Sequence, residues 1–128
     1  MSTLTTRGIQ ITVETFYQRE YSNPLLNEYM FAYRITITNY NSFPIKLLSR
    51  KWFIYDSNGT IEKVEGEGVI GQQPVIVTDD SFQYVSGCNL RTDIGKMHGL
   101  YLVENQFTFE SFEVAIPEFV MISPDKLN

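Results

Sequence analysis

The residues best suited to chemistry are the glycines of the hexapeptide Gly66 to Gly71, which matches the pattern G-x-G-x-x-G. In a dinucleotide-binding fold such glycines permit a tight turn close to a pyrophosphate, and a following helix stabilises the negative charge. Here Pro74 and the β-branched run Val75-Ile76-Val77 follow, and they do not begin a helix. Three acidic residues lie around the loop: Glu62, Glu65 and Glu67. The sequence therefore disfavours a dinucleotide site.

Two other interpretations of the Gly66–Gly71 loop stay open. Glycines supply positive φ and close backbone packing in ordinary loops, which is their commoner use. Alternatively, the backbone N–H groups form an anion-binding nest without a helix, near three cations: Arg50, Lys51 and Lys63. The candidate residues for binding a ligand or partner in this region are Gly66, Gly68, Gly71, Gln73 and Pro74.

A second glycine-bearing segment, from Ser86 to Gly99, is expected to form a long loop. It gathers polar groups, cations and a methionine, and loops on a rigid β-scaffold commonly carry function. Its candidate residues are Ser86, Gly87, Thr92, Gly95, Met97 and Gly99. If the two loops lie at the same end of the fold, they form one composite surface.

Patterns for nucleophilic catalysis are weak. Cys88 and His98 are the single cysteine and the single histidine, and catalysis would need the base beside the nucleophile and a further group to orient the base. We expect Cys88 to behave as a buried small hydrophobe and His98 to lie exposed at a strand edge. The sequence predicts no catalytic residue.

Acidic residues offer oxygen atoms to a hard cation, but without the spacing of a calcium-binding loop. They are Glu62, Glu65, Glu67, Asp79 and Asp80. A solvated acidic rim explains them more simply, and Asp79-Asp80 fits turn chemistry. The sequence therefore predicts no metal site and no cofactor.

The elements that must position these residues are β-strands, because side chains alternate with a period of two along most of the chain. Strands are expected over residues 9–17 and 29–38. A third, over 45–55, is apolar on both faces in places, which suits a central or irregular strand. Asn58-Gly59 then predicts a hairpin turn and a return strand over 60–65.

Four further strands are expected over residues 75–77, 82–85, 97–103 and 107–116. In the last, the apolar phase shifts from odd to even positions, which predicts a β-bulge near Glu110-Ser111, and Pro117 should end the strand. Seven to nine short strands with regular turns are typical of a sandwich or barrel. We expect an all-β sandwich, with a small barrel as the alternative.

Composition narrows the classes of function. A chain of 128 residues suits a single domain over 1–128, and 14% aromatic residues favour strands. The net charge of −5 and the scattered cations disfavour binding to nucleic acid or to an anionic membrane. One cysteine fits a reducing compartment, and there is no signal peptide pattern and no apolar run of about 20 residues. A cytoplasmic protein is expected.

Taken together, these segments resemble the ApaG family from about Ile9 to Val120. The most specific part is the stretch 66–74 followed by 82–87. Further matches at the family's spacing are Leu90, Thr92, Gly95, Met97, Gly99 and Tyr101, with the stretches 31–33, 50–52 and 112–117. The sequence departs from the family at Lys51, where histidine is usual, and at Asp79-Asp80 and Asp93, where the family commonly has Pro-Gly and Pro.

The resemblance implies a fibronectin type III-like or immunoglobulin-like antiparallel β-sandwich of about seven to nine strands. It also implies a bacterial protein linked to cobalt resistance and to efflux of cobalt and magnesium. Similar domains in eukaryotic F-box proteins and in a DNA polymerase δ-interacting protein look like interaction modules. No catalytic residues are established for the family. Without a membrane span, this chain could take part in efflux only indirectly.

The leading hypothesis is a non-enzymatic binding domain that recognises a protein partner or a small anionic ligand through the two glycine-bearing segments. One alternative is a nucleotide or pyrophosphate site on the Gly66–Gly71 loop. Another is direct binding of Co²⁺ or Mg²⁺, although soft and imidazole ligands are few. Pairing of strand edges into a homodimer also stays open.

Overall fold

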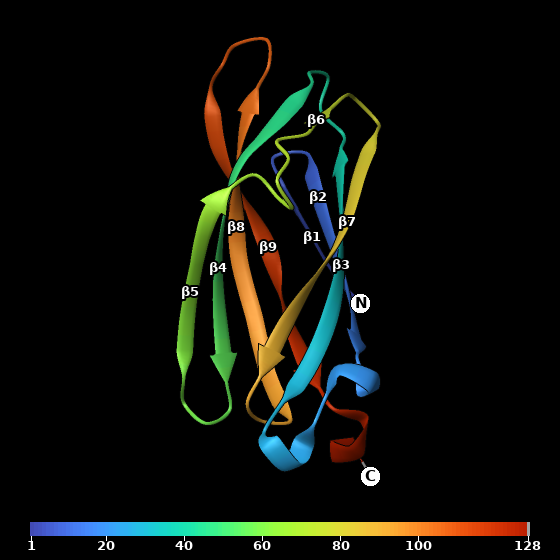
Figure 1. Cartoon of the computed structure of the whole chain (residues 1–128). Helices are drawn as coiled ribbons and strands as arrows, with labels where there is room; N and C mark the ends of the chain where they lie inside the picture. The colour runs from blue at the N-terminus through green and yellow to red at the C-terminus, as the bar shows by residue number, and fades with distance from the viewer. Residues whose placement is uncertain (128) are drawn as a thin grey trace.

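The strands of this chain form two antiparallel sheets packed face to face, as the computed structural model shows for residues 1–127 (Figure 1). The first sheet contains, in spatial order, β1 (Ser2–Thr6), β2 (Ile9–Tyr17), β3 (Tyr29–Asn39) and β7 (Ser81–Leu90). The second contains β5 (Ile61–Glu67), β4 (Ile45–Asp56), β8 (Ile94–Asn105) and β9 (Ser111–Ile122), with the short β6 (Val75–Ile76) also paired to β4. Short 3-10 turns are η1 (Arg19–Tyr21), η2 (Pro24–Leu26) and η3 (Pro124–Leu127). The predicted all-β sandwich is confirmed.

The core lies between the sheets because alternate side chains of each strand point inward. Trp52 of β4 is at its centre and is 3% exposed. Its ring centroid lies 5.5 Å from that of Tyr33, 5.9 Å from that of Phe119 and 6.5 Å from that of Tyr101. Tilted and edge-on contacts of this kind add to the stabilisation from burial, so the aromatic residues join the two sheets.

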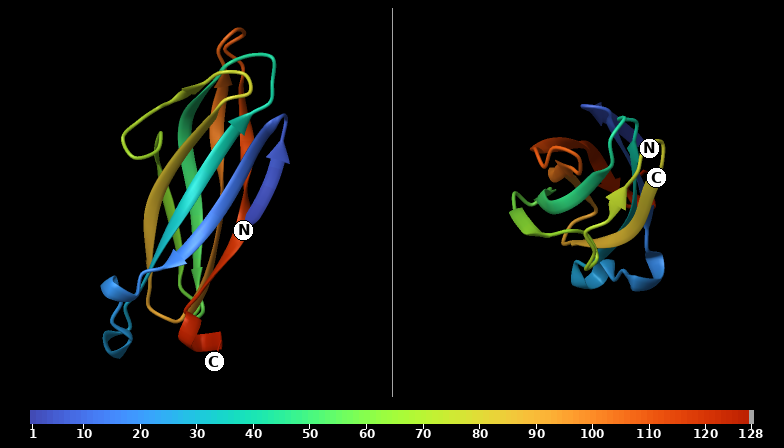
Figure 2. Two further views of the ribbon diagram at one scale, coloured as in Figure 1. Left: turned by 90° about the vertical axis from the view of Figure 1, so that its right-hand side faces the viewer. Right: turned by 90° about the horizontal axis from the view of Figure 1, so that it is seen from above.

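The two long sides of the sandwich differ. On one side β1 and β2 pack against β9. On the other side β5 and β7 are the outer strands of their sheets, and residues 68–74 run between them toward β6 (Figures 1 and 2). This loop therefore covers part of an otherwise open side.

Strand β4 contains an irregularity that determines which of its side chains face the interior. The register of β4 against β8 shifts between Leu47 and Ser49, which leaves Leu48 outside the ladder. The strand is therefore both central and irregular, the two alternatives that its doubly apolar pattern left open. After this β-bulge the inward positions are Arg50, Trp52 and Ile54. The bulge thus turns an arginine toward the interior.

The prediction for the last strand is wrong in three respects. Phe107 and Phe109 belong to the turn before β9 and are 70% and 69% exposed, so they do not belong to its alternation. The register shift lies instead where Met97 pairs with Phe119 but Gly99 pairs with Ile116. Pro117 lies at this bulge and does not end the strand, because a bulge tolerates the missing N–H of proline.

The predicted loop from Ser86 to Gly99 is also wrong. Ser86 and Gly87 lie within β7, and Gly95, Met97 and Gly99 lie within β8, so only residues 91–93 connect the two strands. Glycine in β8 reflects close packing, because a Cβ atom at Gly99 would overlap the carbonyl oxygen of Lys51.

One strand had no signal in the sequence. β1 pairs with β2 through residues Ser2 to Thr6, which are mostly exposed and polar and lack apolar alternation. Within residues 1–127, no helix is long and apolar enough to cross a membrane.

Candidate functional site

The glycine hexapeptide forms the end of a strand and a tight turn. Gly66 and Glu67 belong to β5. The N–H of Val69 donates to the carbonyl of Gln72 at 2.8 Å, and the N–H of Gln72 donates back at 2.9 Å. The two residues between them, Ile70 and Gly71, have φ of 42° and 76°. Positive φ at both central residues is the feature of a type I′ turn, and it is unusual for a β-branched residue such as Ile70.

The turn is attached to the bulge of β4. The carbonyl oxygen of Leu48 accepts hydrogen bonds from the N–H of Gly68 and from Nε2 of Gln73, both at 2.9 Å. The N–H of Leu47 donates to the carbonyl of Pro74 at 3.0 Å. A bulged residue has a carbonyl outside the ladder, and the loop supplies its partners. Gln73 and Pro74 therefore hold the loop in place.

The three glycines of the hexapeptide serve different purposes. A Cβ atom at Gly66 would lie 2.8 Å from Nη1 of Arg50. At Gly68, where φ is 58°, it would overlap the carbonyl oxygen of Gln72. Gly71 has open space around it and is explained by its positive φ alone. The G-x-G-x-x-G letters are thus accounted for by packing and by the turn.

The backbone of this loop offers few free donors to an anion. The N–H groups of Gly68, Val69 and Gln72 all donate to carbonyls within the loop or to β4. An anion-binding nest needs several unengaged N–H groups that converge on one point. The geometry therefore argues against phosphate binding by the loop backbone itself.

Of the three cations near the loop, Arg50 alone faces it. Lys51 and Lys63 both approach Glu65 on the outer face of the second sheet, at 3.6 Å and 3.0 Å. Nη1 of Arg50 instead donates to the carbonyls of Glu67 at 3.0 Å and Gly68 at 2.8 Å. No carboxylate among the described residues forms an ion pair with Arg50.

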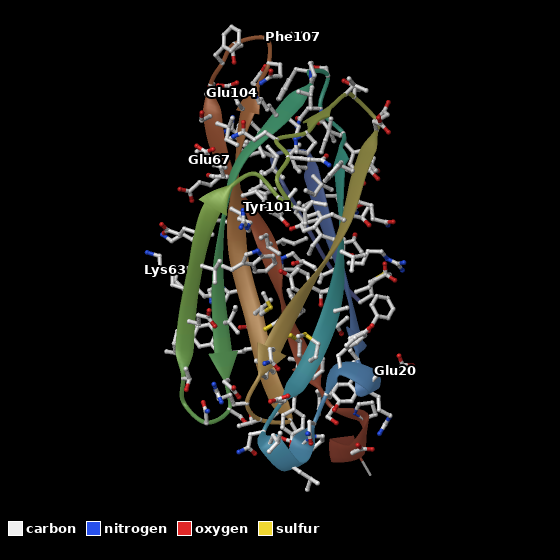
Figure 3. The ribbon with its side chains drawn as sticks, viewed as in Figure 1. Glu20, Lys63, Glu67, Tyr101, Glu104 and Phe107 are labelled. Atoms are coloured by element: carbon white, nitrogen blue, oxygen red, sulfur yellow. The ribbon has the colours of Figure 1, made fainter. Side chains whose placement is uncertain are left out.

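A cavity of about 140 Å³ lies under the loop, between the two sheets. Its lining comes from β3, β4, the loop and β7: Tyr33, Arg50, Trp52, Val69, Ile70, Tyr84 and Ser86. Figure 3 shows Tyr101 in the space between the sheets near the end of β5, whereas Lys63 points outward from that strand. The cavity lies between the sheets because residues of both sheets line it, and the turn at Ile70, which is 56% exposed, lines it from above.

Two tyrosines line this cavity, Tyr33 and Tyr84, and Tyr101 lies beside Tyr84; all three are neutral. Burial raises the pKa of Tyr33, and raises those of Tyr84 and Tyr101 further. The hydroxyl groups of Tyr84 and Tyr101 lie 2.5 Å apart, and Tyr33 pairs with Ser86 across the β3–β7 ladder. Arg50 lines the same cavity as Tyr33 and Tyr84, and its charge opposes the rise of these pKa values but has the smallest effect on them. The site combines one guanidinium with several neutral hydroxyl groups.

Ser86 is the residue of the second predicted segment that reaches this cavity. Gly87 lies on the outer face of β7, while Gly95 and Met97 are buried in β8. Thr92 lies at the end of the sandwich that carries the 56–60 turn, where its hydroxyl bonds to Asp56 and Ser57. Apart from Ser86, the structure does not bring the residues of the second predicted segment to the glycine loop.

Sequence reasoning named Arg50 only as a neighbouring cation and missed Tyr33, Tyr84 and Tyr101. The signal for Arg50 was present, since it has the same parity as Trp52 and Ile54 along an apolar strand. Using that signal required knowing that the bulge at Leu48 changes the parity of β4.

Cys88 and His98 lie far from a catalytic arrangement. Cys88 faces the core from β7, and burial raises the pKa of its thiol to about 12, so the predicted buried cysteine is confirmed. His98 was expected at a strand edge, but it lies on the central strand β8, stacked between Phe53 at 5.2 Å and Tyr55 at 5.3 Å on the outer face. The second sheet separates the two side chains.

The acidic residues make turns and surface ion pairs. Asp79 has a φ of 64°, and Oδ1 of Asp80 accepts a hydrogen bond from the N–H of Ser81 at 2.8 Å, which confirms the predicted turn. Glu65 lies beside two lysines, which lower the pKa of its carboxyl through hydrogen bonding and charge. In the part of the chain that the structure describes, no three His, Cys, Asp or Glu side chains are grouped to hold a metal ion.

Fold and site together define an antiparallel β-sandwich domain with a glycine loop fixed over one open side. A family model for the ApaG domain matches residues 19–105. The chain belongs to the ApaG domain family.

Relatives agree with this assignment along nearly the whole chain. A protein ApaG of Brucella canis is 44% identical over 126 residues, covering 98% of this chain and 96% of that relative. A protein ApaG of Allorhizobium ampelinum is 44% identical over 120 residues, covering 94% of this chain and 92% of that relative. A crystal structure of an ApaA protein from Bordetella pertussis is 40% identical with a TM-score of 0.88, covering 91% of this chain and 94% of that one.

Proposed function

We propose that this chain is a non-enzymatic binding domain whose protein partner docks on the open side of the sandwich, at the turn of the glycine loop. The observation that carries the proposal is Ile70. Its side chain is 56% exposed, although its backbone is held at a φ of 42° that β-branched residues avoid. Unfavourable backbone conformations persist where the surrounding structure enforces them, and they concentrate at functional sites.

The loop presents Ile70 in a fixed position. The paired hydrogen bonds between Val69 and Gln72, and the bonds to Leu48, hold the turn before any partner arrives. Such pre-organisation lowers the entropy lost on binding, and one apolar anchor can supply a large share of the affinity. The structure therefore supports recognition by the turn more than by the backbone of the glycines.

The proposal extends to the class of function and to the cellular location of the protein. The separation of Cys88 and His98 favours binding over nucleophilic catalysis. The family resemblance implies a link to cobalt or magnesium efflux. In this proposal the partner takes part in efflux, and this chain contributes by binding the partner. A cytoplasmic location completes the proposal, since one buried cysteine suits a reducing compartment.

A nucleotide or pyrophosphate is the weaker candidate. The cavity of about 140 Å³ beneath the loop is smaller than the roughly 300–1,000 Å³ of small-molecule pockets. A larger hollow of about 490 Å³ beside Arg50 and Lys51 is lined by three carboxylates, Glu65, Glu67 and Glu113, which disfavour a polyphosphate. The N–H groups of Gly68, Val69 and Gln72 are engaged, and Nη1 of Arg50 already donates to the carbonyls of Glu67 and Gly68. NMR titration with ATP and with pyrophosphate tests this candidate, and saturable shifts of the Gly68 and Val69 amides would revive it.

The test of the proposed function replaces Ile70 by asparagine. Asparagine tolerates positive φ, so the turn is retained while the apolar side chain is removed. The matched control is Val120→Asn, because Val120 is 54% exposed on the outer face of β9. We expect Ile70→Asn to abolish co-purification of a stoichiometric partner from native cell extract and Val120→Asn to leave it intact. The opposite pattern would place the interface elsewhere.

A further inference from the structure

We infer that the cavity beneath the glycine loop is a subsite for a single carboxylate group, bound by the guanidinium of Arg50 together with the neighbouring hydroxyls. The inference rests on the proposed function, since a partner seated at Ile70 would bring an acidic side chain or a chain end to this cavity. A small free carboxylic acid is the other source of the same chemistry.

The positive charge of Arg50 has no carboxylate counter-ion among the described residues. A guanidinium has five N–H donors, and within the described residues Arg50 donates only from Nη1, to the carbonyls of Glu67 and Gly68. These acceptors are neutral, and among residues 1–127 no carboxylate pairs with this side chain. A partly buried cation without a counter-ion is unfavourable, so an anion that enters the cavity removes a cost already present in the free protein.

The residues that line the cavity offer hydroxyl groups and no negative charge. Tyr33, Tyr84 and Ser86 contribute hydroxyl groups, and none of the lining residues carries a carboxylate. Burial raises the pKa of both tyrosines, so their hydroxyls keep their protons. Neutral hydroxyls beside a cation can donate to an oxygen anion, and hydrogen bonds to a charged acceptor are stronger than neutral ones.

The size of the cavity and its single cation favour a carboxylate over a nucleotide or a phosphate. A volume of about 140 Å³ admits a small acid or the end of a side chain, but not a nucleotide. Arg50 contributes one positive charge, which matches a carboxylate, whereas a phosphate monoester carries about −1.5 to −2 at neutral pH. Exposed Glu67 at the end of β5 would disfavour the dianion further.

Gly66 faces Arg50 across the β4–β5 ladder. A Cβ atom here would lie 2.8 Å from Nη1 and 3.0 Å from Cζ of the guanidinium. The absence of a side chain at Gly66 therefore lets Arg50 reach the cavity. This gives the first glycine of the hexapeptide a role in binding that does not involve its own N–H.

The test is an NMR titration of the full chain with sodium acetate at constant ionic strength, with acetamide as the neutral probe of the same shape. We expect saturable shifts of the Gly68 and Ser86 amides with acetate and none with acetamide. Arg50→Gln should weaken acetate binding about tenfold or more, as expected for loss of a charge-assisted bond. Lys51→Gln, which removes an outward-facing cation, should leave it unchanged.

Because Arg50 also holds the loop, Ser86→Ala provides a second variant that retains those bonds. It should weaken acetate binding about threefold while the remaining spectrum stays unchanged. Acetate shifts that do not saturate, or that are equal in wild type and Arg50→Gln, would overturn the subsite.

The two sources of the carboxylate are separated by co-purification with Arg50→Gln and with Ser86→Ala, because the second variant keeps the hydrogen bonds of Arg50 to the loop. Loss of the partner together with acetate binding identifies the partner as the carrier of the carboxylate. Retention of the partner with loss of acetate binding identifies a free small acid. If acetate never binds but Ile70→Asn still loses the partner, the subsite is wrong and the proposed function stands. If acetate binds and Ile70→Asn keeps the partner, the docking surface fails and the subsite stands.

Discussion

Gly66 and Gly68 differ in what a side chain would meet, and the difference separates binding from folding. At Gly66 an added methyl group meets the mobile end of Arg50, which can move away. At Gly68 an added methyl group meets the backbone carbonyl of Gln72, which is fixed in the turn. The φ of 58° at Gly68 is also unfavourable for any residue with a side chain, so the substitution strains the loop. Residues with the same letter in one motif therefore serve separate purposes.

This difference predicts opposite outcomes for two alanine variants. Gly68→Ala should lower the free energy of unfolding by about 2–4 kcal/mol, because overlap and positive φ act together. Gly66→Ala should lower it by less than about 1 kcal/mol yet remove acetate binding, because Arg50 is displaced. Urea denaturation measures the first effect and the NMR titration the second. A Gly66→Ala variant that binds acetate like the wild type would contradict the role assigned to this glycine.

Buried ionisable groups predict the response of stability to alkaline pH. The thiol of Cys88 has its pKa raised by burial from 9.0 to about 12, and burial also raises the pKa values of Tyr33, Tyr84 and Tyr101. The folded state thus binds these protons more tightly than the unfolded state. The free energy of unfolding should be independent of these groups below about pH 8 and fall above about pH 9.

The slope assigned to Cys88 is at most about 1.4 kcal/mol per pH unit between pH 9 and 12. Cys88→Ala removes this titration, so its unfolding free energy should fall less steeply than that of the wild type, with the tyrosine part unchanged. Urea denaturation at a series of pH values measures both slopes. Equal slopes in the two proteins would show that the thiol does not keep its proton in the fold.

At the scale of elements, the bulge of β4 connects the sheet to the loop. Leu48 leaves the ladder, and its carbonyl accepts hydrogen bonds from Gly68 and Gln73. The same bulge turns Arg50 toward the interior. One irregularity in a strand therefore both anchors the loop and places the cation beneath it.

The anchoring role predicts different effects for two adjacent glutamines. Gln73→Ala removes the hydrogen bond from Nε2 to Leu48 and should lower the free energy of unfolding by about 0.5–1.5 kcal/mol. Hydrogen exchange of the Val69 and Gln72 amides should become faster, because the loop opens more often. Gln72→Ala is the matched control, since its exposed side chain makes no hydrogen bond in the described structure. Equal exchange rates in both variants would remove the role of Gln73.

The strands that alternation predicted are those with one buried face. Residues 9–17 and 29–38 have such a face, and the structure places strands there. β1 is polar and mostly exposed, so no apolar alternation marks it. Glycines at 95 and 99 resembled loop residues, but they are sites where β4 passes close to β8. Local sequence does not reveal a contact between two strands. The predicted lengths of β7 and β8 were therefore too short, and the segment from Ser86 to Gly99 was wrongly predicted to be a loop.

At the scale of the whole molecule, the sandwich has one packed side and one side covered by the glycine loop. β1 and β2 close the first side against β9, and β5 and β7 border the second (Figure 2). The period of the strands predicted two sheets, but not which edges would meet. The position of the cavity depends on that pairing, which explains why Arg50 and the tyrosines were not recognised as one site.

The proposed function requires that a protein partner docks at the turn of the glycine loop. Photo-cross-linking in the native host tests it most directly, with p-benzoylphenylalanine incorporated in place of Ile70 and, in a matched strain, in place of Val120. The two side chains are 56% and 54% exposed, so random collisions should label both equally. We predict a discrete cross-linked protein from position 70 and none from position 120. A discrete product from position 120 with none from position 70 would contradict the claim.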